Sequence, residues 1–433
     1  MGLLENIANN FSNSDSRGGN GTEFHHATSE NVKSNQLEAS IERLVHGQFL
    51  FGTTNQGHNY LKTGYEDDFS QVLRKMTKQS TTHAGILTKK SKMVAGIKAE
   101  YNTRGVKGKA KAMQADVFLN NAGGANKNIH SQIKHAAYQY QLNGGFALLI
   151  KYDDAFTKLV SLKSLDANQY RRQTNIEGIP TDKFVVRRSF GFMAESLLDN
   201  ASRVVAPFSK FNKKDKEQLL YVMNPDSGQE YYGVPNYIAA YNFIASDHEF
   251  GEQIYNSSSN GFMPKVMATF FGRNMTKDEK GTQAKRFTES FVGSKASPVI
   301  TAWIKKPEEK PEIDVLNVAN LDKTLDVMSR LNDQKILTAH NVTSPTLFGV
   351  MIGGKLGGTG NEMIAAYQIF RSTETLPDRE ILLEAFNWIL ESVGYSVKLG
   401  VYEEPIDLGT MNGAGSGERN DLKPDPKKPA NND

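Results

Sequence analysis

Residues 349–355, GVMIGGK, fit the G-x-x-x-x-G-K pattern of a phosphate-binding loop. In nucleotide-binding proteins the backbone of such a loop cradles the phosphates, the lysine contacts them, and a following Ser or Thr ligates magnesium. Here Leu356 stands where the hydroxyl residue is needed, and Gly357 and Gly358 disfavour a helix that starts at the lysine. A proline-containing segment precedes the motif in place of a buried strand. The sequence therefore favours a flexible glycine-rich loop over a nucleotide site.

Other residue types that could do chemistry are not grouped in the sequence. The histidines form no H-x-x-x-H pair beside a glutamate, and no G-x-S-x-G elbow is present. His25 and His26 have no further ligands near them, and the adjacent acids at 153–154 and 403–404 are typical of solvated turns. We therefore expect no catalytic residue, no cofactor and no metal site.

Composition limits the class of protein. The chain has 433 residues, of which 38% are hydrophobic and 37 are glycine, which favours thin layers or burial completed between subunits. Its net charge of +3 gives no strong field for nucleic acid, so any DNA contact would be local. The absence of cysteine excludes disulfides and thiolate metal sites. No apolar run of about 18 residues occurs, so no membrane span is expected.

Two long helices flank a central stretch of the chain. Pro235 predicts the entry of a helix over 236–258, because proline suits the first helical turn. Its stripe at helical spacing comprises Tyr237, Tyr241, Ile244, His248, Gly251 and Tyr255. Tyrosines, alanines and glycine in place of leucines indicate a packed wall with a polar outer side. A second helix is predicted over 321–340, where leucines and Met328 share one face and Pro345 prevents continuation.

The segments around this pair have weaker patterns. After the glycine-rich loop, Glu362 begins a helix that Pro377 kinks or restarts, and a last strand is expected within 394–409. Upstream, the sequence predicts helices over 65–78, from 81 onward into a strand, and over 129–142, the last ended by Gly144. The lysine-rich run 104–111 is interpreted as a glycine-rich hairpin. Short strands up to residue 230 favour an antiparallel sheet, hence an α+β class.

Several phrases occur in an order that resembles tailed-phage portal proteins, the head-to-tail connectors. They are GVPNYIAAYNFI, NGFMP, TAHNVTSPTLFG, the glycine-asparagine loop and LPDREILLEAFNWIL. The resemblance covers roughly residues 60–400 and implies a portal fold. Its parts would be a flexible arm (1–36), the first part of an α/β wing (37–233), a stem helix (234–258), a small α/β clip (259–317), a second stem helix (318–341), a tunnel loop (342–361), a kinked wing helix with terminal strand (362–409) and a disordered tail (410–433). The crown of this family would be reduced or absent.

The resemblance also implies a function without enzymatic activity. Portal proteins form a ring, usually a dodecamer, at one capsid vertex, through which double-stranded DNA is packaged and ejected. Their partners are the major capsid protein, the terminase large subunit and the neck or adaptor proteins, and the virion is assembled in the host cytoplasm. The tunnel loop would present Gly353, Gly354, Lys355, Gly357, Gly358 and Asn361 to DNA. Stem packing would involve Tyr237, Tyr241, Ile244 and Tyr255. The alternatives are a nucleotide-binding enzyme with a phosphate loop and another ring or scaffold component of a virion.

Overall fold

The structure is a computed structural model whose contacts divide the chain into two compact units. One unit comprises residues 1–35 and 249–322, and the other comprises residues 36–248 and 323–433. The described residues are 23–26, 51–54, 59–64, 67–102, 106–124, 127–191, 201–226, 229–259, 267–271, 276, 278, 281–282, 285, 300–304, 321–349, 360–395 and 397–403.

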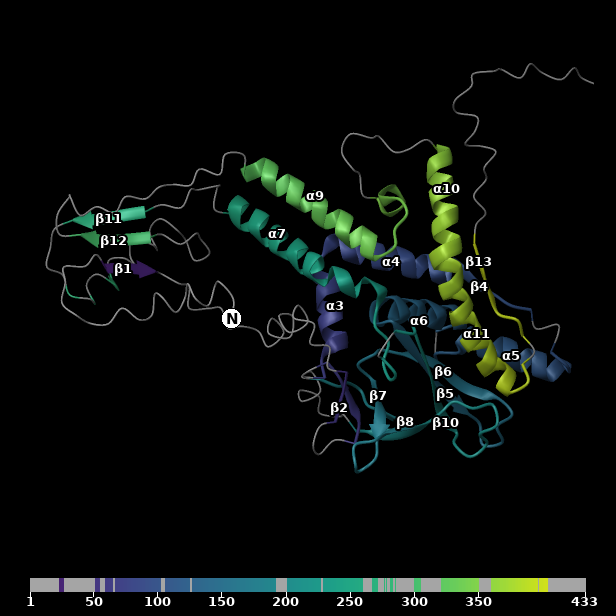
Figure 1. Cartoon of the computed structure of the whole chain (residues 1–433). Coiled ribbons are helices and arrows are strands. Elements are labelled where there is room, and N and C mark those ends of the chain that lie inside the picture. The colour runs from purple at the N-terminus through teal and green to yellow at the C-terminus, as the bar shows by residue number, and fades with distance from the viewer. Residues whose placement is uncertain are drawn as a thin grey trace, which may run out of the picture. The chain divides into compact units, whose positions relative to one another are not determined.

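The larger unit contains a six-stranded sheet in the order β6-β5-β10-β9-β8-β7, which lies below the helices in the view of Figure 1. Its strands are β5 (Gly145–Tyr152), β6 (Leu159–Leu165), β7 (Tyr170–Thr174), β8 (Pro180–Val186), β9 (Arg203–Pro207) and β10 (Glu217–Met223). All neighbours are antiparallel, as the sequence predicts, except β9 and β10, which are parallel. The buried Gln218 donates to the carbonyls of Asn212 and Asp215, and thereby holds the loop that returns the chain alongside β9.

Strand β5 is apolar along nearly its whole length because both of its faces are buried. Phe146, Leu148 and Ile150 point into a large core beneath the helices. Ala147 and Leu149 alternate with them and join a second cluster with side chains of β7, β8, β9 and β10. The sheet is therefore the middle layer between two apolar clusters.

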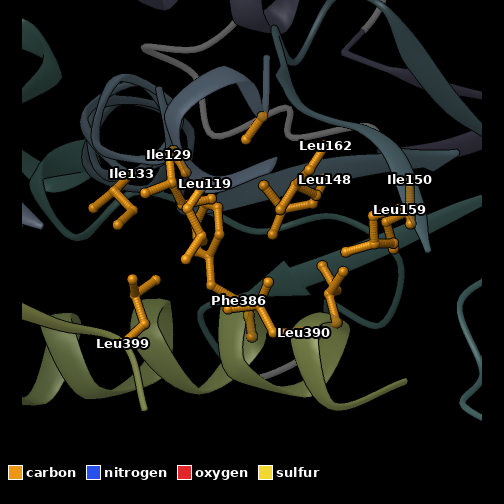
Figure 2. Packing of buried hydrophobic residues seen from close by; sticks show 14 of the residues in the cluster. Leu119, Ile129, Ile133, Leu148, Ile150, Leu159, Leu162, Phe386, Leu390 and Leu399 are labelled. Atoms are coloured by element: carbon orange, nitrogen blue, oxygen red, sulfur yellow. The ribbon is translucent and has the colours of Figure 1, made fainter. Parts of the chain in front are cut away.

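Three helices cover one face of this sheet and supply about half of the larger core (Figure 2). They are α5 (Lys109–Asn121), α6 (Ile129–Asn143) and α11 (Leu376–Ser392). Leu119, Ile133 and Phe386 come from different helices and are each 0% exposed. Burial of a side chain of this size stabilises the fold by about 1.5–3 kcal/mol. This packing joins the sheet and its helices in one apolar core.

A second group of helices packs around a separate core in the same unit. Its members are α3 (Phe69–Gln79), α4 (Thr81–Ala95), the 3-10 helix η3 (Asn236–Ala240), the first turns of α7 (Tyr241–Ser259), the end of α9 (Leu321–Ala339), the 3-10 helix η5 (Pro345–Phe348) and the end of α10 (Gly360–Phe370). The observed α9 agrees with the helix predicted over 321–340. The helix predicted over 236–258 is also present, but its first turn is 3-10.

Helices α10 and α11 form one continuous path through a π-helical turn, η6 (Arg371–Thr375). The sequence predicts a kink or restart at Pro377, and the irregular turn lies just before it. Proline has no N–H for an α-helical bond, and a π-helical turn shifts the hydrogen-bond register locally. Leu376 donates its N–H to the carbonyl of Arg371, which lets the chain continue past the proline.

Two short ribbons complete the larger unit. One pairs β2 (Phe51–Thr54) with β3 (Leu61–Thr63), and the other pairs β4 (Lys98–Glu100) with β13 (Gly400–Tyr402). The smaller unit contains a three-stranded sheet of β1 (Glu23–His26), β12 (Ile300–Ile304) and β11 (Met267–Phe271). Strand β1 lies in the stretch expected to be a flexible arm. It pairs antiparallel with β12, which satisfies the backbone groups of each strand that face the other.

The lysine-rich stretch 104–111 is predicted as a hairpin, but its last residues, 109–111, are the start of α5, and residues 104 and 105 lie outside the described residues. Gly108, with φ of 94°, ends the preceding turn, and the residues after it are mainly good helix formers. Ala115, Phe118 and Leu119 are its buried residues. Because so few of its residues are apolar and buried, the helical pattern of α5 is weak. The glycines just before it therefore dominate a prediction made from the sequence. The remainder of the predicted arm and the whole predicted tail, 410–433, lie outside the described residues.

Candidate functional site

The candidate site is the junction at which α7 and α9 meet the N-terminus of α4. Ser80, the N-cap of α4, donates from Oγ to Oδ2 of Asp247 on α7 at 2.6 Å. Two residues later, Thr82 Oγ1 donates to Oδ1 of Asp333 on α9 at 2.7 Å. A carboxylate is favoured near a helix N-terminus because the helix dipole is positive there. One helix end therefore holds the first turns of α7 and the last turns of α9.

Direct contacts between the two long helices reinforce this arrangement. The buried Asn332 of α9 donates Nδ2 to the carbonyl of Phe243 on α7 at 2.8 Å. Burial, with a further contribution from Asp247, raises the pKa of Asp333, while the hydroxyl of Thr82 opposes that shift. The junction therefore brings two acids close together and depends on the α4 hydroxyls to hold them.

Entry into η3 depends on two glycines that touch. A Cβ on Gly233 would lie 2.0 Å from the carbonyl oxygen of Gly144, and a Cβ on Gly144 would lie 2.3 Å from the backbone of Val234. Gly144 also has φ of 70° as the C-cap of α6, which confirms the predicted helix end. Tyr237 then donates its hydroxyl to the carbonyl of Leu142 at 2.6 Å. The end of α6 thus positions the start of the first long helix.

A buried hydrogen-bonded chain crosses the same junction through two histidines. Thr77 Oγ1 donates to the carbonyl of Leu73 at 2.9 Å, so it can only accept from Nε2 of His83, at 3.2 Å. His83 Nδ1 is then the acceptor for Nε2–H of His340, at 2.9 Å. These partners assign the proton of each neutral ring to Nε2. The chain links α3, α4 and the end of α9.

Both imidazoles are neutral in this environment. Burial lowers the pKa of His83 to about 4. Burial, with contributions from His83 and Lys90, lowers the pKa of His340 well below its ordinary value. Tyr237 stacks on His340 with ring centroids 5.0 Å apart and lies 4.5 Å from His83. Protonation of either histidine would place a charge among aromatic rings, which burial disfavours.

The kinked helix is joined to α4 by a buried ion pair. Lys90 Nζ lies 2.7 Å from Oε2 of Glu374, and the side chain of Lys90 is only 3% exposed. Asn341, just after α9, donates to the other oxygen of Glu374 at 3.2 Å. Phe348 of η5 meets the buried Phe370 edge to face, with centroids 5.3 Å apart. The π-helical turn therefore lies over α4 and beside the end of α9.

The other side of this turn carries an arginine-glutamate cluster. Arg371 and Arg379 both form ion pairs with Glu403, the former at 2.7 Å. Burial opposes ionisation of Glu403, but the hydrogen bonds from Arg379 and Arg371 outweigh it and lower its pKa. Arg379 also donates to the carbonyl of Val94 at the end of α4. The chain after α11 thereby ties the kinked helix to α4, which bounds the junction.

The predicted stem-packing residues separate into two groups. Tyr237, Tyr241 and Ile244 are at most 5% exposed, and they pack against α3, α4 and the end of α9 of the same chain. That part of the stripe is therefore buried without a neighbouring subunit. Within-chain burial arises because α4 and α9 approach from two sides. Tyr255, further along α7, is 60% exposed.

The predicted tunnel-loop residues lie mostly outside the part of the chain that the structure describes. Gly353, Gly354, Lys355, Gly357 and Gly358 lie outside the described residues, while Asn361 lies in the first turn of α10. What precedes the G-x-x-x-x-G-K motif is the 3-10 helix η5, and Gly349 ends it with φ of 81°. A phosphate-binding loop follows a buried strand. That condition is not met here.

Sequence reasoning missed the polar residues of the junction. His83 and His340 are separated by 257 positions in the sequence, and Thr82 and Asp333 are separated by 251. Two signals in the sequence could have identified them. One is a histidine on the apolar side of the helix predicted from 81 and of the helix predicted over 321–340, and the other is Ser80 at an N-cap position.

Among the described residues, no group of His, Cys, Asp and Glu could hold a metal ion, and no helix is long and apolar enough to cross a membrane.

Comparison with protein-family models gives no match, and comparison with curated proteins gives none. Among solved structures, the chain is similar to one from the virion of a native gene transfer agent particle, with 12% identity, a TM-score of 0.47, and coverage of 86% of this chain and 91% of that chain. It is also similar to a chain from the neck of the native particle, computed with C12 symmetry, with 12% identity, a TM-score of 0.49, and coverage of 82% of this chain and 88% of that chain. For an HK97-family phage portal protein from Corynebacterium diphtheriae, the identity is 12%, the TM-score is 0.41, and the coverage is 76% of this chain and 95% of that chain.

Proposed function

We propose that this chain is a phage portal protein, which forms the ring at a capsid vertex through which double-stranded DNA is packaged and ejected. The observation that carries this proposal is the junction at α4, where one helix end holds the bases of α7 and α9. The chain between these helices belongs to a separate compact unit. Along the chain, a folded body, a first long helix, a separate smaller unit and a second long helix follow one another in the order that a wing, a stem and a clip require.

The dimensions of the two helices suit a stem. Each contains 19 residues, which corresponds to about 28 Å at 1.5 Å per residue. The phrases GVPNYIAAYNFI and TAHNVTSPTLFG lie at the two ends of the pair that join the body. The resemblance noted in the sequence therefore coincides with the junction.

The charge balance suits a channel that DNA must pass through. Many lysines along such a channel would bind the phosphate backbone strongly through counterion release and would slow translocation. The chain carries 51 basic and 48 acidic residues, and Arg330 on α9 is paired with Asp326 at 2.8 Å. We further propose that the glycine-rich loop faces the channel and that Lys355 makes one weak phosphate contact per subunit.

The partners in this proposal are the major capsid protein, the terminase large subunit and then the neck or adaptor proteins, within a virion assembled in the host cytoplasm. The chain itself would be structural, with no enzymatic activity. The test is light scattering and negative-stain imaging of the purified full chain. We expect closed rings with a central hole, usually of twelve subunits. A monodisperse monomer at micromolar concentration contradicts the proposal.

The loop assignment has its own experiment. Deletion of residues 353–358 should leave rings intact and impair DNA packaging or retention. In this proposal the glycines of the loop allow it to change conformation in the channel and take no part in ring assembly. Loss of rings in the deletion variant, with rings formed by the wild type, would show that the loop is structural.

A further inference from the structure

Helix α10 exposes an apolar surface that the described part of its own chain does not cover. Its sequence is GNEMIAAYQIF, and only Phe370, at its end, is buried. Met363 is 38% exposed and Ile369 is 54% exposed. Within the described residues, its main contacts are with η5 and η6 at that same end. A helix of 11 residues is marginal in water without packing, so this surface needs a cover.

A second uncovered apolar surface lies on α9 of the same unit. Val327 is 63% exposed, and Met328 and Leu331 are about half exposed. Lys335 continues this ridge one turn later and is also exposed. An apolar ridge on the outside of a helix is typical of an interface.

The two ridges match in spacing and in charge. On α10, Glu362, Ala365 and Ile369 share one face, and the acid and the isoleucine are seven positions apart. On α9, Lys335, Leu331 and Met328 share one face with the same seven-residue span in the opposite direction. If the helices pack antiparallel, Glu362 meets Lys335, Leu331 faces the small Ala365, and Ile369 meets Met328. A parallel packing would place the acid against methionine, which desolvation disfavours.

We propose that α10 of one copy of this chain packs antiparallel on α9 of the next copy through these two ridges. The inference rests on the proposed ring and specifies its interface. Two different surfaces that pair between copies make a heterologous contact, and such contacts close into rings when the rotation allows it. The occupant is therefore a second copy of the chain, with its α9 ridge supplying both the apolar and the basic groups.

Cysteine cross-linking tests this directly because the chain contains no cysteine. A Met328→Cys, Ile369→Cys double variant of the full chain, treated with a short bismaleimide, should give a ladder of covalent multimers on a denaturing gel. Each single variant should give none. The matched control, Met328→Cys with Ile176→Cys, should also give none, since Ile176 is fully exposed on the β7–β8 turn.

A charge exchange provides the second measurement. Glu362→Lys and Lys335→Glu should each raise the concentration at which half of the rings dissociate by about fivefold, the scale of an exposed ion pair. The double exchange should restore the wild-type value, which a purely structural role of either residue would not do. Circular dichroism should be the same for all four proteins.

The outcomes separate the two proposals. A wild-type chain that remains monomeric overturns both the ring and this interface. Wild-type rings without a ladder overturn the interface alone. A cross-link that forms within one chain, seen as a shifted monomer band, also overturns it, because α10 would then be covered by its own chain. A ladder with restoration by the charge exchange supports it.

Discussion

The larger unit contains two cores that differ in kind. The core between the sheet and α5, α6 and α11 is built of aliphatic and aromatic side chains, such as Leu148, Ile389 and Phe386, all fully buried. The core at the helix junction contains Phe370 and Ile336 but adjoins the buried His83, His340 and Lys90. Apolar burial is insensitive to pH, whereas buried polar groups stabilise only when every partner is present in the correct protonation state. The stability of the core under the sheet should therefore not depend on pH, whereas the stability of the junction should.

The largest effect is expected in the apolar core. Phe386→Ala removes a fully buried ring from between α11 and the sheet and should lower the free energy of unfolding by about 4 kcal/mol. Urea unfolding followed by circular dichroism measures this. Trp388→Ala, on the exposed side of the same helix, is the control and should cost much less. Equal losses in the two variants would mean that this core is not the main source of stability.

A smaller loss is expected from the ion pair at the junction. Lys90→Met leaves Glu374 without its cation beside α4 and should cost about 3 kcal/mol. The double variant Lys90→Met, Glu374→Leu should recover most of that loss, because no unpaired charge remains. The same urea measurement applies. A double variant no more stable than the single one would show that the pair is needed for packing rather than for charge balance.

The junction should also respond to mild acid. The folded-state pKa values of His83 and His340 are lower than the unfolded value near 6.5, so the unfolded chain takes up protons first as pH falls. Stability is full above pH 6.5 and should decrease by about 2 kcal/mol by pH 5 from His83 alone, at 1.36 kcal/mol per unit. Thermal unfolding between pH 7 and pH 5 measures the slope.

The neutral double variant His83→Asn, His340→Gln should lose this slope, whereas Phe386→Ala should retain it. If the double variant keeps the full slope, other groups are responsible and the contrast between the two cores disappears.

The smallest effect is expected on the outer surface of α9. Arg330 and Asp326 form an ion pair four residues apart, and both side chains are more than half exposed. Arg330→Ala should change the free energy of unfolding by less than about 0.5 kcal/mol, because exposed pairs are screened by solvent. A loss comparable to that of Lys90→Met would indicate that this stretch of α9 is packed in the isolated protein.

The sequence predicts the elements of this fold better than their contacts. Strong local signals, such as the apolar run of β5 and the glycine at 144, lead to correct predictions because a backbone angle or a periodic face decides them. The helix α5 is missed because its apolar face has few members. The irregular turn is expected at Pro377 but lies just before it, at Arg371–Thr375. The chain accommodates the proline by changing the hydrogen bonds of the preceding turn, and the proline by itself does not indicate where that change occurs.

The junction could not be predicted, since it is made by distant segments. Thr82 and Asp333 are 251 positions apart, and Lys90 and Glu374 are 284 apart. Each is an ordinary polar residue on a helix, and only the tertiary structure shows how far it is buried and which atom it meets. The burial of Tyr237 within its own chain follows from the same contacts.

The π-helical turn at Arg371–Thr375 separates the phases of two helices. An added residue advances the side chains beyond it by about 100° around the axis, since 3.6 residues make one turn. Shortening the turn by one residue would rotate the outward face of α10 relative to α11 while α11 stays docked on the sheet. A single insertion or deletion in the turn can therefore rotate α10 about its axis without repacking α11. Related chains could differ in the direction of α10 through such one-residue changes alone.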